Sequence, residues 1–579
     1  MRKALLFPFL LVGSTLACSS SSGGSATTGD AGNHPKDSGT ADHVTSHSDG
    51  STSTKDSGGG STDAGADVQQ SSGDGGDGGG GFDAGPPPTP VGTAIEKGSV
   101  TILGTTDDGY VVYANATAIK AIPEAGGTAT TLVDEGDAGG GQIPDVFVIH
   151  NDVFMWTNVD ETSSAGTLTL WSHTLGTPKQ VSTTSTPFAA AASDDSSTVV
   201  YSDATASDAS KMNLVGATMT ALGTPTTIVM GIDPGTNCAP TIDFSGTGTS
   251  LYAVVGSCTP ATTDGGADGP QTVVSFPVAT WKGASLATNV ATFAVDDTGT
   301  SAAIGLATGQ LEIVPLAGGT PVLIDSATAL GTTPSLYLSK KDKFVLYNTA
   351  AGALTSSILS ASTPVTLLTT GAIDIDGVAA SEGAALVDTG VDSNTGLLMG
   401  LSLASTSAAA AASPLVTGTN EAGLFGDAFT ADSNYALYLT SPTQDDVGNN
   451  IGTLTAVALS KPGTPITVAT TSGSTFQQGS FGLFTFETGN LSNFLAGFAS
   501  ATDFALTGSK VVFADAFNGD GGFFGQTNIN VVDLSTTTAA TTVMTNADPG
   551  FAISFDKKYI IYTISFGGST DGIYTVAVP

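Results

Sequence analysis

The sequence predicts an all-β domain made of repeated four-stranded antiparallel units, preceded by a disordered tether. Short runs of Val, Ile, Leu, Phe and Tyr, bounded by Gly, Asp, Ser and Pro, recur from about residue 96 onward. No part of that region combines helical periodicity with helix caps. Residues 18–95 are mostly Ser, Gly, Asp, Thr and Ala, which bury too little apolar surface to form a core. The expected organisation is therefore a leader over 1–17, a tether over 18–95 and a β domain over 96–579.

The first residues have the layout of a secretory signal peptide. Arg2 and Lys3 precede about ten apolar residues, too few for the roughly 20 that span a bilayer. The run STLACSS that follows resembles the lipobox of bacterial lipoproteins, although Thr15 stands where that motif has Leu. The resemblance implies cleavage before Cys18 and a lipid on its thiol, which would anchor the chain to a membrane. Ser19 after the cysteine implies the outer membrane or cell surface. The alternative is an ordinary signal-peptidase site at the same bond.

The other two cysteines, Cys238 and Cys258, are predicted to form a disulfide. They flank a hairpin, and a turn centred on Gly248 would place Phe244 opposite Tyr252 and Cys238 opposite Cys258. Directly opposite strand positions meet the distance that a disulfide requires. Exported proteins keep such bonds. The alternative is a pair of free thiols.

The charge excludes one class of partner. The net charge is −36, from 52 acidic and 16 basic residues, and the only arginine is Arg2 in the leader. Nucleic-acid binding needs a basic surface, and the sequence has none after the leader. The acidity instead suits a solvated surface outside the cytoplasm.

A repeat is visible as a tight polar turn followed by an apolar run that often ends in an aromatic residue. Seven clear copies end at Tyr113, Trp156, Tyr201, Tyr347, Tyr438, Phe513 and Tyr562. Weaker copies lie at 251–254, 302–305 and 384–387, which makes ten candidate units at intervals of about 45 residues. A second hairpin follows within the unit, since AIPEAGGT at 121–128 nearly repeats as IVPLAGGT at 313–320, and each Gly-Gly suits a hairpin turn.

Four strands in each repeat of 40 to 50 residues is typical of β-propeller blades. The pattern, clearest over 106–133 and 296–324, resembles the TolB-like and WD-type propeller families, which implies a propeller fold; the Ser-Pro-Asp-Gly turn of TolB repeats is nowhere intact. Propellers usually have four to eight blades. The sequence therefore leaves open seven to ten blades in one ring, or two rings.

Two parts of the chain depart from the repeat. The last unit, 548–579, stops after its third strand, and we expect the segment from Val91 to Ala94 to supply the fourth and remove an exposed edge. Between Tyr438 and Phe513 an insertion contains five phenylalanines: Phe481, Phe484, Phe486, Phe494 and Phe498. They would cap a face, plug a channel or pack against a neighbouring blade.

The sequence has no recognisable catalytic or metal-binding motif, so it predicts no catalytic residue, no cofactor and no metal. Only His150 and His173 lie in the β domain, and they lack the spacing of zinc ligands. There is no P-loop and no Gly-x-Ser-x-Gly elbow. His150, followed by Asn-Asp, is interpreted as part of a turn. The clusters at 392–396 and 515–521 carry oxygen ligands that suit calcium, but such Asx-Gly clusters are usually turns.

The leading hypothesis is a non-enzymatic, lipid-anchored propeller on the cell surface or outer membrane that binds a protein or polysaccharide ligand. One alternative is a propeller hydrolase or lyase whose carboxylates converge at a channel mouth. Another is a purely structural cell-surface protein.

Overall fold

The computed structural model describes residues 89–579, apart from 116, 135–144, 161–164, 206–207, 233–241, 246, 257–270, 297–298, 317–318, 327–335, 340–342, 359–362, 370–371, 373, 390–397, 407–411, 422–428, 445–449, 470–475, 478–483, 487–493, 497–505, 520–524, 537–538, 549–550 and 566–567. All described residues belong to one compact unit that includes Ala84–Pro579. The leader, Cys18, nearly all of the predicted tether, the 392–396 cluster and both Cys238 and Cys258 lie outside the described residues.

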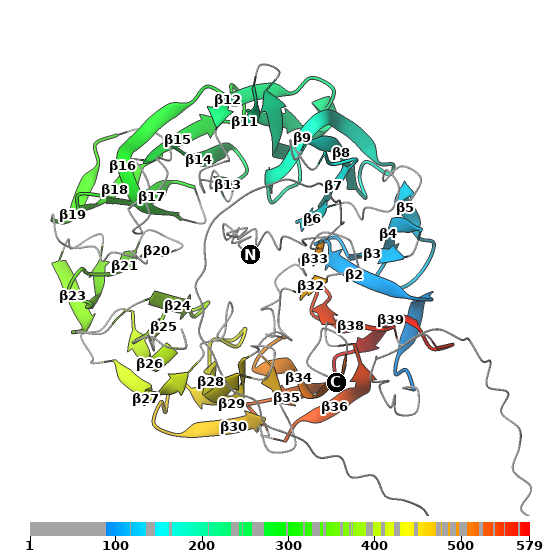
Figure 1. Cartoon of the computed structure of the whole chain (residues 1–579). Helices are drawn as coiled ribbons and strands as arrows, with labels where there is room; N and C mark the ends of the chain where they lie inside the picture. Colours follow the sequence, from blue (N-terminus) through cyan, green and yellow to red (C-terminus); the bar gives the residue numbers. More distant parts are fainter. Residues whose placement is uncertain are drawn as a thin grey trace, which may run out of the picture. The chain divides into compact units, whose positions relative to one another are not determined.

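The described residues form an all-β fold of antiparallel sheets (Figure 1), with one short 3-10 helix at Met219–Ala221 and no α-helix in the described ranges. We call each group of up to four successive strands a module. Module 1 is β2 (Val100–Thr105), β3 (Tyr110–Asn115), β4 (Ala118–Pro123) and β5 (Thr130–Asp134). Module 6 is β20 (Leu336–Leu338), β21 (Phe344–Asn348), β22 (Leu354–Ile358) and β23 (Thr363–Leu368). Module 7 is β24 (Asp374–Val378), β25 (Ala384–Asp388), β26 (Leu398–Ser405) and β27 (Ser413–Glu421).

Two seven-stranded sheets each contain two modules, because one long strand belongs to both. Modules 2 and 3 are β6 (Asp145–Ile149), β7 (Asp152–Thr157), β8 (Gly166–Ser172), the shared β9 (Lys179–Ala192), β10 (Thr198–Thr205), β11 (Asp208–Thr218) and β12 (Thr226–Ile232). The N-terminal half of β9 pairs with β8 and its C-terminal half pairs with β10. Modules 4 and 5 are β13 (Ile242–Phe244), β14 (Ser250–Gly256), β15 (Gln271–Pro277), the shared β16 (Ala284–Val295), β17 (Ser301–Leu306), β18 (Leu311–Pro315) and β19 (Val322–Asp325).

Three modules remain near the C-terminus. Module 8 is β28 (Tyr435–Gln444), β29 (Asn450–Ala458), β30 (Pro465–Ala469) and β31 (Phe476–Gln477). Module 9 is β34 (Lys510–Gly519), β35 (Gly525–Asp533) and β36 (Thr541–Ala547). Module 10 is β37 (Phe551–Ile553), β38 (Tyr559–Ile564), β39 (Gly572–Ala577) and β1 (Thr93–Lys97).

The ten apolar runs predicted from the repeat are confirmed as equivalent strands. In eight modules the run is the second strand, namely β3, β7, β10, β14, β17, β21, β25 and β38. In modules 8 and 9 it is β28 or β34. The described residues before these strands pair with them through the Phe429–Ala436 bridge and the Leu506–Lys510 hydrogen bond. The eight second strands lie inside their sheets, and every residue of β7 and β21 is buried on both faces.

The aromatic residues that end these runs are core residues. Trp156, Tyr201, Tyr347 and Tyr562 are all fully buried. A buried ring with a polar tip usually has a hydrogen-bond partner for that tip, although the buried Tyr201 hydroxyl has none among the described residues. The indole nitrogen of Trp156 donates to Ser185 at 2.9 Å, and the hydroxyl of Tyr347 donates to Asp325, at the end of the preceding module, at 2.5 Å.

The core is divided into clusters that join one module to the next. Side chains of modules 1 and 2 meet around Val112 and Val153, and those of modules 9 and 10 meet around Val512 and Ile560. The intervening pairs are joined in the same way. A further cluster joins the last module to the first and consists of Ile95, Val100, Ile102, Val111, Tyr113, Ile122, Ile561 and Ile573. Each of these clusters joins a module to its neighbour, as repeat architectures do.

The expected closing strand is confirmed. β1 pairs with β39 in an antiparallel register, with Thr93 opposite Thr575 and Lys97 opposite Gly572. Just before it, the Tyr562 hydroxyl donates to the Val91 carbonyl at 2.6 Å and lies 2.9 Å from the Val91 amide. β1 therefore extends across the predicted boundary at about residue 96, because its pairing with β39 places Thr93–Lys97 in the sheet.

The predicted register of the cysteine hairpin was wrong by one residue. Phe244 lies opposite Leu251, and Ile242 lies opposite Ala253. The turn closes between Ser245 and Ser250, and the amide of Gly248 bonds to Ser245 with a φ of 65°. The turn is therefore centred half a residue earlier than Gly248, which shifts every pair. The alignment that favoured the Cys238–Cys258 bond does not hold in the described strands, and the disulfide stays a prediction.

The insertion contains a hairpin of β32 (Phe484–Phe486) and β33 (Phe494–Ala496). Strand β33 contacts β2 of module 1 and β6 of module 2, which are far from it in the sequence. This favours the interpretation of the insertion as a segment that covers other modules. Phe481 and Phe498 lie outside the described residues.

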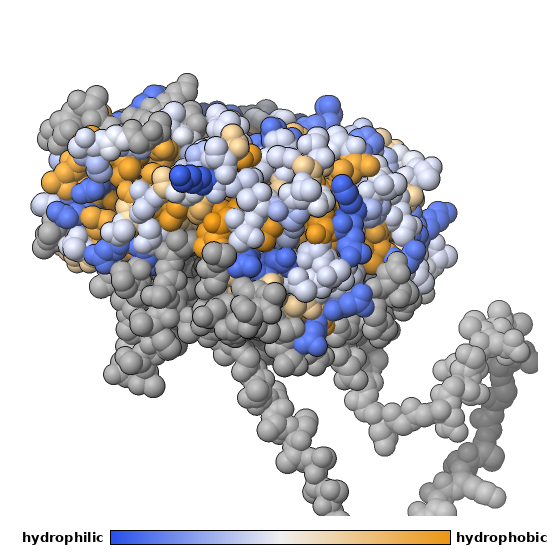
Figure 2. Space-filling view, turned by 90° about the horizontal axis from the view of Figure 1, so that it is seen from above, coloured by the Kyte–Doolittle hydropathy of each residue, from blue (hydrophilic) through white to orange (hydrophobic). Residues whose placement is uncertain are grey.

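The outer surface mixes polar and apolar residues. In the view of Figure 2, apolar residues form separate patches among polar ones. Val322 and Leu323, on the last strand of module 5, are about half exposed. No described helix is long and apolar enough to cross a membrane.

Candidate functional site at the turns of modules 1 to 3

Among the described turns that precede the equivalent strands, those of modules 1, 3, 8 and 10 share a short local motif. In four turns a Ser or Thr hydroxyl donates to an Asp two residues later, as Thr106 does to Asp108 at 2.5 Å and Ser193 to Asp195 at 2.7 Å. The same hydroxyl accepts the backbone N–H that starts the next strand, at 3.0 Å from Tyr110 in module 1. Thr430–Asp432 and Ser554–Asp556 repeat the arrangement in modules 8 and 10.

Sequence reasoning missed this Ser/Thr-x-Asp motif. The signal was present, since the same residue types precede the aromatic-ending runs. Such side chains form turns by bonding to the nearby backbone. In Asp195 burial raises the pKa, but hydrogen bonds from Ser193 and Ser197 outweigh it and leave the pKa below its ordinary value. The Asp195 carboxylate is therefore ionised near neutral pH.

Module 2 has a shorter turn, and its histidine joins three modules. Ile149 pairs directly with Asp152, which leaves His150 and Asn151 as the turn, with a φ of 54° at His150. The His150 carbonyl accepts the amide of Asp107 at 3.1 Å. The ring Nδ1 lies 3.0 Å from Asp107 Oδ2 in module 1, and Nε2 lies 3.3 Å from Asp194 Oδ1 in module 3. His150 is therefore in a turn, as predicted, and it also links modules on both sides.

The surroundings of His150 favour its charged form. The hydrogen bond to Asp107 raises the pKa of His150, burial lowers it, and the charges of Asp107, Asp194 and Asp152 raise it further, so that the net shift is upward. The side chain of His150 is 14% exposed and that of Asp194 is 48% exposed. The His150 ring is thus partly shielded from solvent, whereas the Asp194 carboxylate of module 3 is open to it.

Asp152, at the start of β7, is an unusual acid. Its side chain is fully buried, and neither carboxylate oxygen makes a hydrogen bond of ordinary geometry. Burial raises the pKa of Asp152 to about 7, although the Ser196 hydroxyl and the charge of His150 lower it. The charges of Asp108 and Asp195 act in the same direction as burial. Near neutral pH this group titrates between a neutral acid and a buried anion.

The second histidine of the domain also lies against module 1. The Tyr110 hydroxyl and His173 Nδ1 are 2.7 Å apart, and the two rings are tilted with centroids 4.7 Å apart. Trp171 packs edge-on against Tyr110 at 5.6 Å. In the part of the chain that the structure describes, no three His, Cys, Asp or Glu side chains are placed to hold a metal ion.

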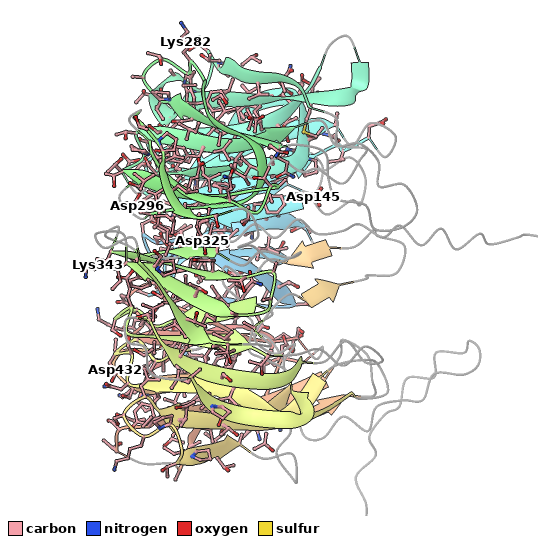
Figure 3. All side chains as sticks on the ribbon, turned by 90° about the vertical axis from the view of Figure 1, so that its left-hand side faces the viewer. Asp145, Lys282, Asp296, Asp325, Lys343 and Asp432 are labelled. Atoms are coloured by element: carbon pink, nitrogen blue, oxygen red, sulfur yellow. The ribbon has the colours of Figure 1, made fainter. Side chains whose placement is uncertain are left out.

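The exposed part of this site is acidic. Asp108, Asp194 and Asp195 are exposed on the turns of modules 1 and 3, around the partly buried His150. Figure 3 shows the turn residues Asp296 and Asp432 on one side of the ribbons, together with Lys343, whereas Asp145 at the start of β6 lies toward the other side. A surface of this kind attracts cationic groups.

Comparisons with known proteins do not assign a family. No family model matches the sequence, and no curated protein matches it. Among solved structures, a eukaryotic initiation factor has a TM-score of 0.41 at 10% identity, over 66% of this chain and 90% of that chain. Dipeptidyl peptidase 4 of Porphyromonas gingivalis has a TM-score of 0.38 at 10% identity, over 82% and 65% of the two chains. TolB of Acinetobacter baumannii has a TM-score of 0.22 at 11% identity, over 46% and 62%. At these TM-scores the likenesses carry no argument about this protein.

Proposed function

We propose that the ten modules form one closed β-propeller. Successive modules share apolar clusters along the chain, and one further cluster joins module 10 to module 1. The pairing of β1 with β39 completes the last module with a strand from the N-terminal end. Closure by a strand from the opposite end of the chain would leave no unpaired edge where the ring begins.

We further propose that this domain is a non-enzymatic binding module anchored through a lipid on Cys18. The leader and the lipobox resemblance support export and lipidation, and the Ser/Gly/Asp-rich residues after Cys18 support a flexible tether. β1 follows that segment directly and is itself part of a sheet, so the anchor would hold the domain through a hydrogen-bonded strand. The β domain would then lie at the outer membrane or cell surface.

The observation that carries the binding role is the exposed acidic surface at the turns of modules 1 and 3. Asp108 and Asp195 accept hydrogen bonds within their turns, and Asp108, Asp194 and Asp195 are open to solvent. Carboxylates held in this way suit a ligand with cationic groups, such as a basic protein segment or an amino-sugar polysaccharide.

Two measurements test the proposal. Mass spectrometry of the mature N-terminus should show acylated Cys18, and the Cys18→Ala variant should leave the membrane fraction; an unmodified amine and thiol would remove the anchor. Oligolysine and chitosan oligosaccharides should bind the domain, and Asp108→Asn with Asp194→Asn should weaken that binding at least several-fold. The matched control is Asp432→Asn with Asp556→Asn, which removes two charges from the equivalent turns of modules 8 and 10. Equal loss in the control would show that only the net charge matters.

One observation favours an enzyme as the second candidate. Asp152, with its pKa raised to about 7 by burial, lies near His150, and such pairs serve in general acid–base catalysis. A catalytic group must reach its substrate, however, and Asp152 is fully buried. The binding role is therefore preferred.

A further inference from the structure

His150 lies where the turns of modules 1, 2 and 3 meet. Each ring nitrogen faces a carboxylate, Asp107 at 3.0 Å and Asp194 at 3.3 Å. A neutral imidazole carries only one N–H and turns a lone pair toward whatever faces its other nitrogen. Both contacts are favourable together only in the imidazolium form, which carries an N–H on each nitrogen and a positive charge that attracts both carboxylates. The Asp107 contact is a hydrogen bond, and the Asp194 contact is an ion pair.

We propose that His150 is a proton-operated clamp that, when protonated, holds Asp107 of module 1 and Asp194 of module 3 together, and that releases Asp194 when it loses a proton. Asp194 is the partner released because its contact is the longer one and its side chain is half exposed, so its carboxylate gains water easily. Asp107 keeps the remaining N–H, since its backbone amide is also bonded to the His150 carbonyl. The contact between modules 2 and 3 is therefore the one that responds to pH.

The charged groups that act on His150 from the three turns are all carboxylates. Asp107 and Asp194 contact the ring, and Asp152 acts on it from its own hairpin. Asp108 and Asp195 act in turn on Asp152. A protonated His150 therefore places a positive charge among these carboxylates. This agrees with the upward shift of the His150 pKa.

The sign of the effect follows from that direction. A histidine whose pKa is higher in the folded state contributes stability that is fully present below its unfolded value of about 6.5. The contribution is lost as the pH rises through the folded pKa. The clamp is therefore closed in mildly acidic conditions and opens as the surroundings become alkaline. The clamp does not require a ligand, although it shares Asp194 with the proposed acidic surface.

The direct test is a histidine titration by NMR on the full mature chain, with His150→Asn and His173→Asn used for assignment. Asn suits the positive φ at position 150, so the first variant keeps the turn. His150 should titrate above 6.5, and Asp194→Asn should lower its midpoint. Asp556→Asn should not change it. A midpoint at or below 6.5, or one that Asp194→Asn leaves unchanged, overturns the clamp.

Amide hydrogen exchange distinguishes a working clamp from a histidine that titrates without consequence. After correction for intrinsic exchange, residues 193–198 should lose protection in the wild type as the pH rises through the His150 midpoint. In His150→Asn they should be equally unprotected at both ends of that range. His150→Lys should protect them throughout, and Lys557, at a φ of 59°, shows that a lysine fits such a position. Protection in the wild type that does not change with pH would contradict the proposal.

Discussion

The contact between modules 10 and 1 and the contact among the turns of modules 1 to 3 use opposite chemistry. The first is apolar: Ile95, Ile561 and Ile573 pack with residues of module 1, and the strand that brings Ile95 comes from the N-terminal end of the domain. The second has an apolar cluster beneath it, but its outer part is a histidine among carboxylates.

The comparison distinguishes how much a contact stabilises the fold from how strongly that stabilisation depends on pH. Burial of apolar side chains stabilises by an amount that hardly depends on pH. The turns instead carry groups that titrate, because burial raises the pKa of Asp152 to about 7 and the contact with Asp107 raises the pKa of His150. Variants at the two places should therefore differ in size and in pH dependence.

The largest effect is expected for Ile95→Asp. This side chain is 8% exposed, and an unpaired charge in its place should cost more than about 4 kcal/mol of unfolding free energy. Denaturant unfolding of the domain measures it. Thr93→Asp, at an exposed position of the same strand, is the control and should cost little. Equal costs would show that β1 contributes nothing to the closing contact.

Asp152→Asn should have the next largest effect, and one that depends on pH. The folded pKa of Asp152 is raised from 3.8 to about 7, so the wild type loses stability as the pH rises from about 4 to 7. The variant lacks this loss and should be more stable above pH 7, by up to about 4 kcal/mol, because a tenfold change in proton affinity corresponds to about 1.4 kcal/mol. Unfolding curves at pH 4.5 and 8 measure the difference. A gain that is the same at both pH values would contradict the assignment.

Gly92→Ala should destabilise the closing contact by about 1 to 3 kcal/mol. Gly92 has a φ of 94°, and a Cβ there would lie 2.1 Å from the carbonyl oxygen of Thr575. Gly98→Ala has a similar φ of 103° but no atom within 4 Å of the added carbon, so it isolates the clash from the backbone strain. Thermal unfolding should rank Gly92→Ala below Gly98→Ala.

Tyr562→Phe should have the smallest effect of the four. It removes the hydroxyl that bonds to Val91 and leaves the ring in place, which should cost about 1 kcal/mol. Hydrogen exchange of β1 should rise while that of module 6 stays unchanged. If exchange rose equally in both, the bond would not be specific to the closing strand.

The sequence alone determined the repeating strands and the strand that completes the last module. Both follow from local sequence patterns, namely apolar runs after polar turns and a final unit that is one strand short. The sequence did not predict the exact start of β1, because composition does not give strand pairing. It also did not predict the register of the hairpin around Gly248, because the centre of a turn depends on its hydrogen bonds.

The candidate site was decided by the tertiary structure. His150 was visible in the sequence as a turn residue, yet Asp107 and Asp194 lie 43 and 44 residues away from it along the chain. They meet only because equivalent turns of successive modules adjoin. Local sequence specifies each strand and turn, whereas the partners of a charged side chain depend on which surfaces the modules bury against each other.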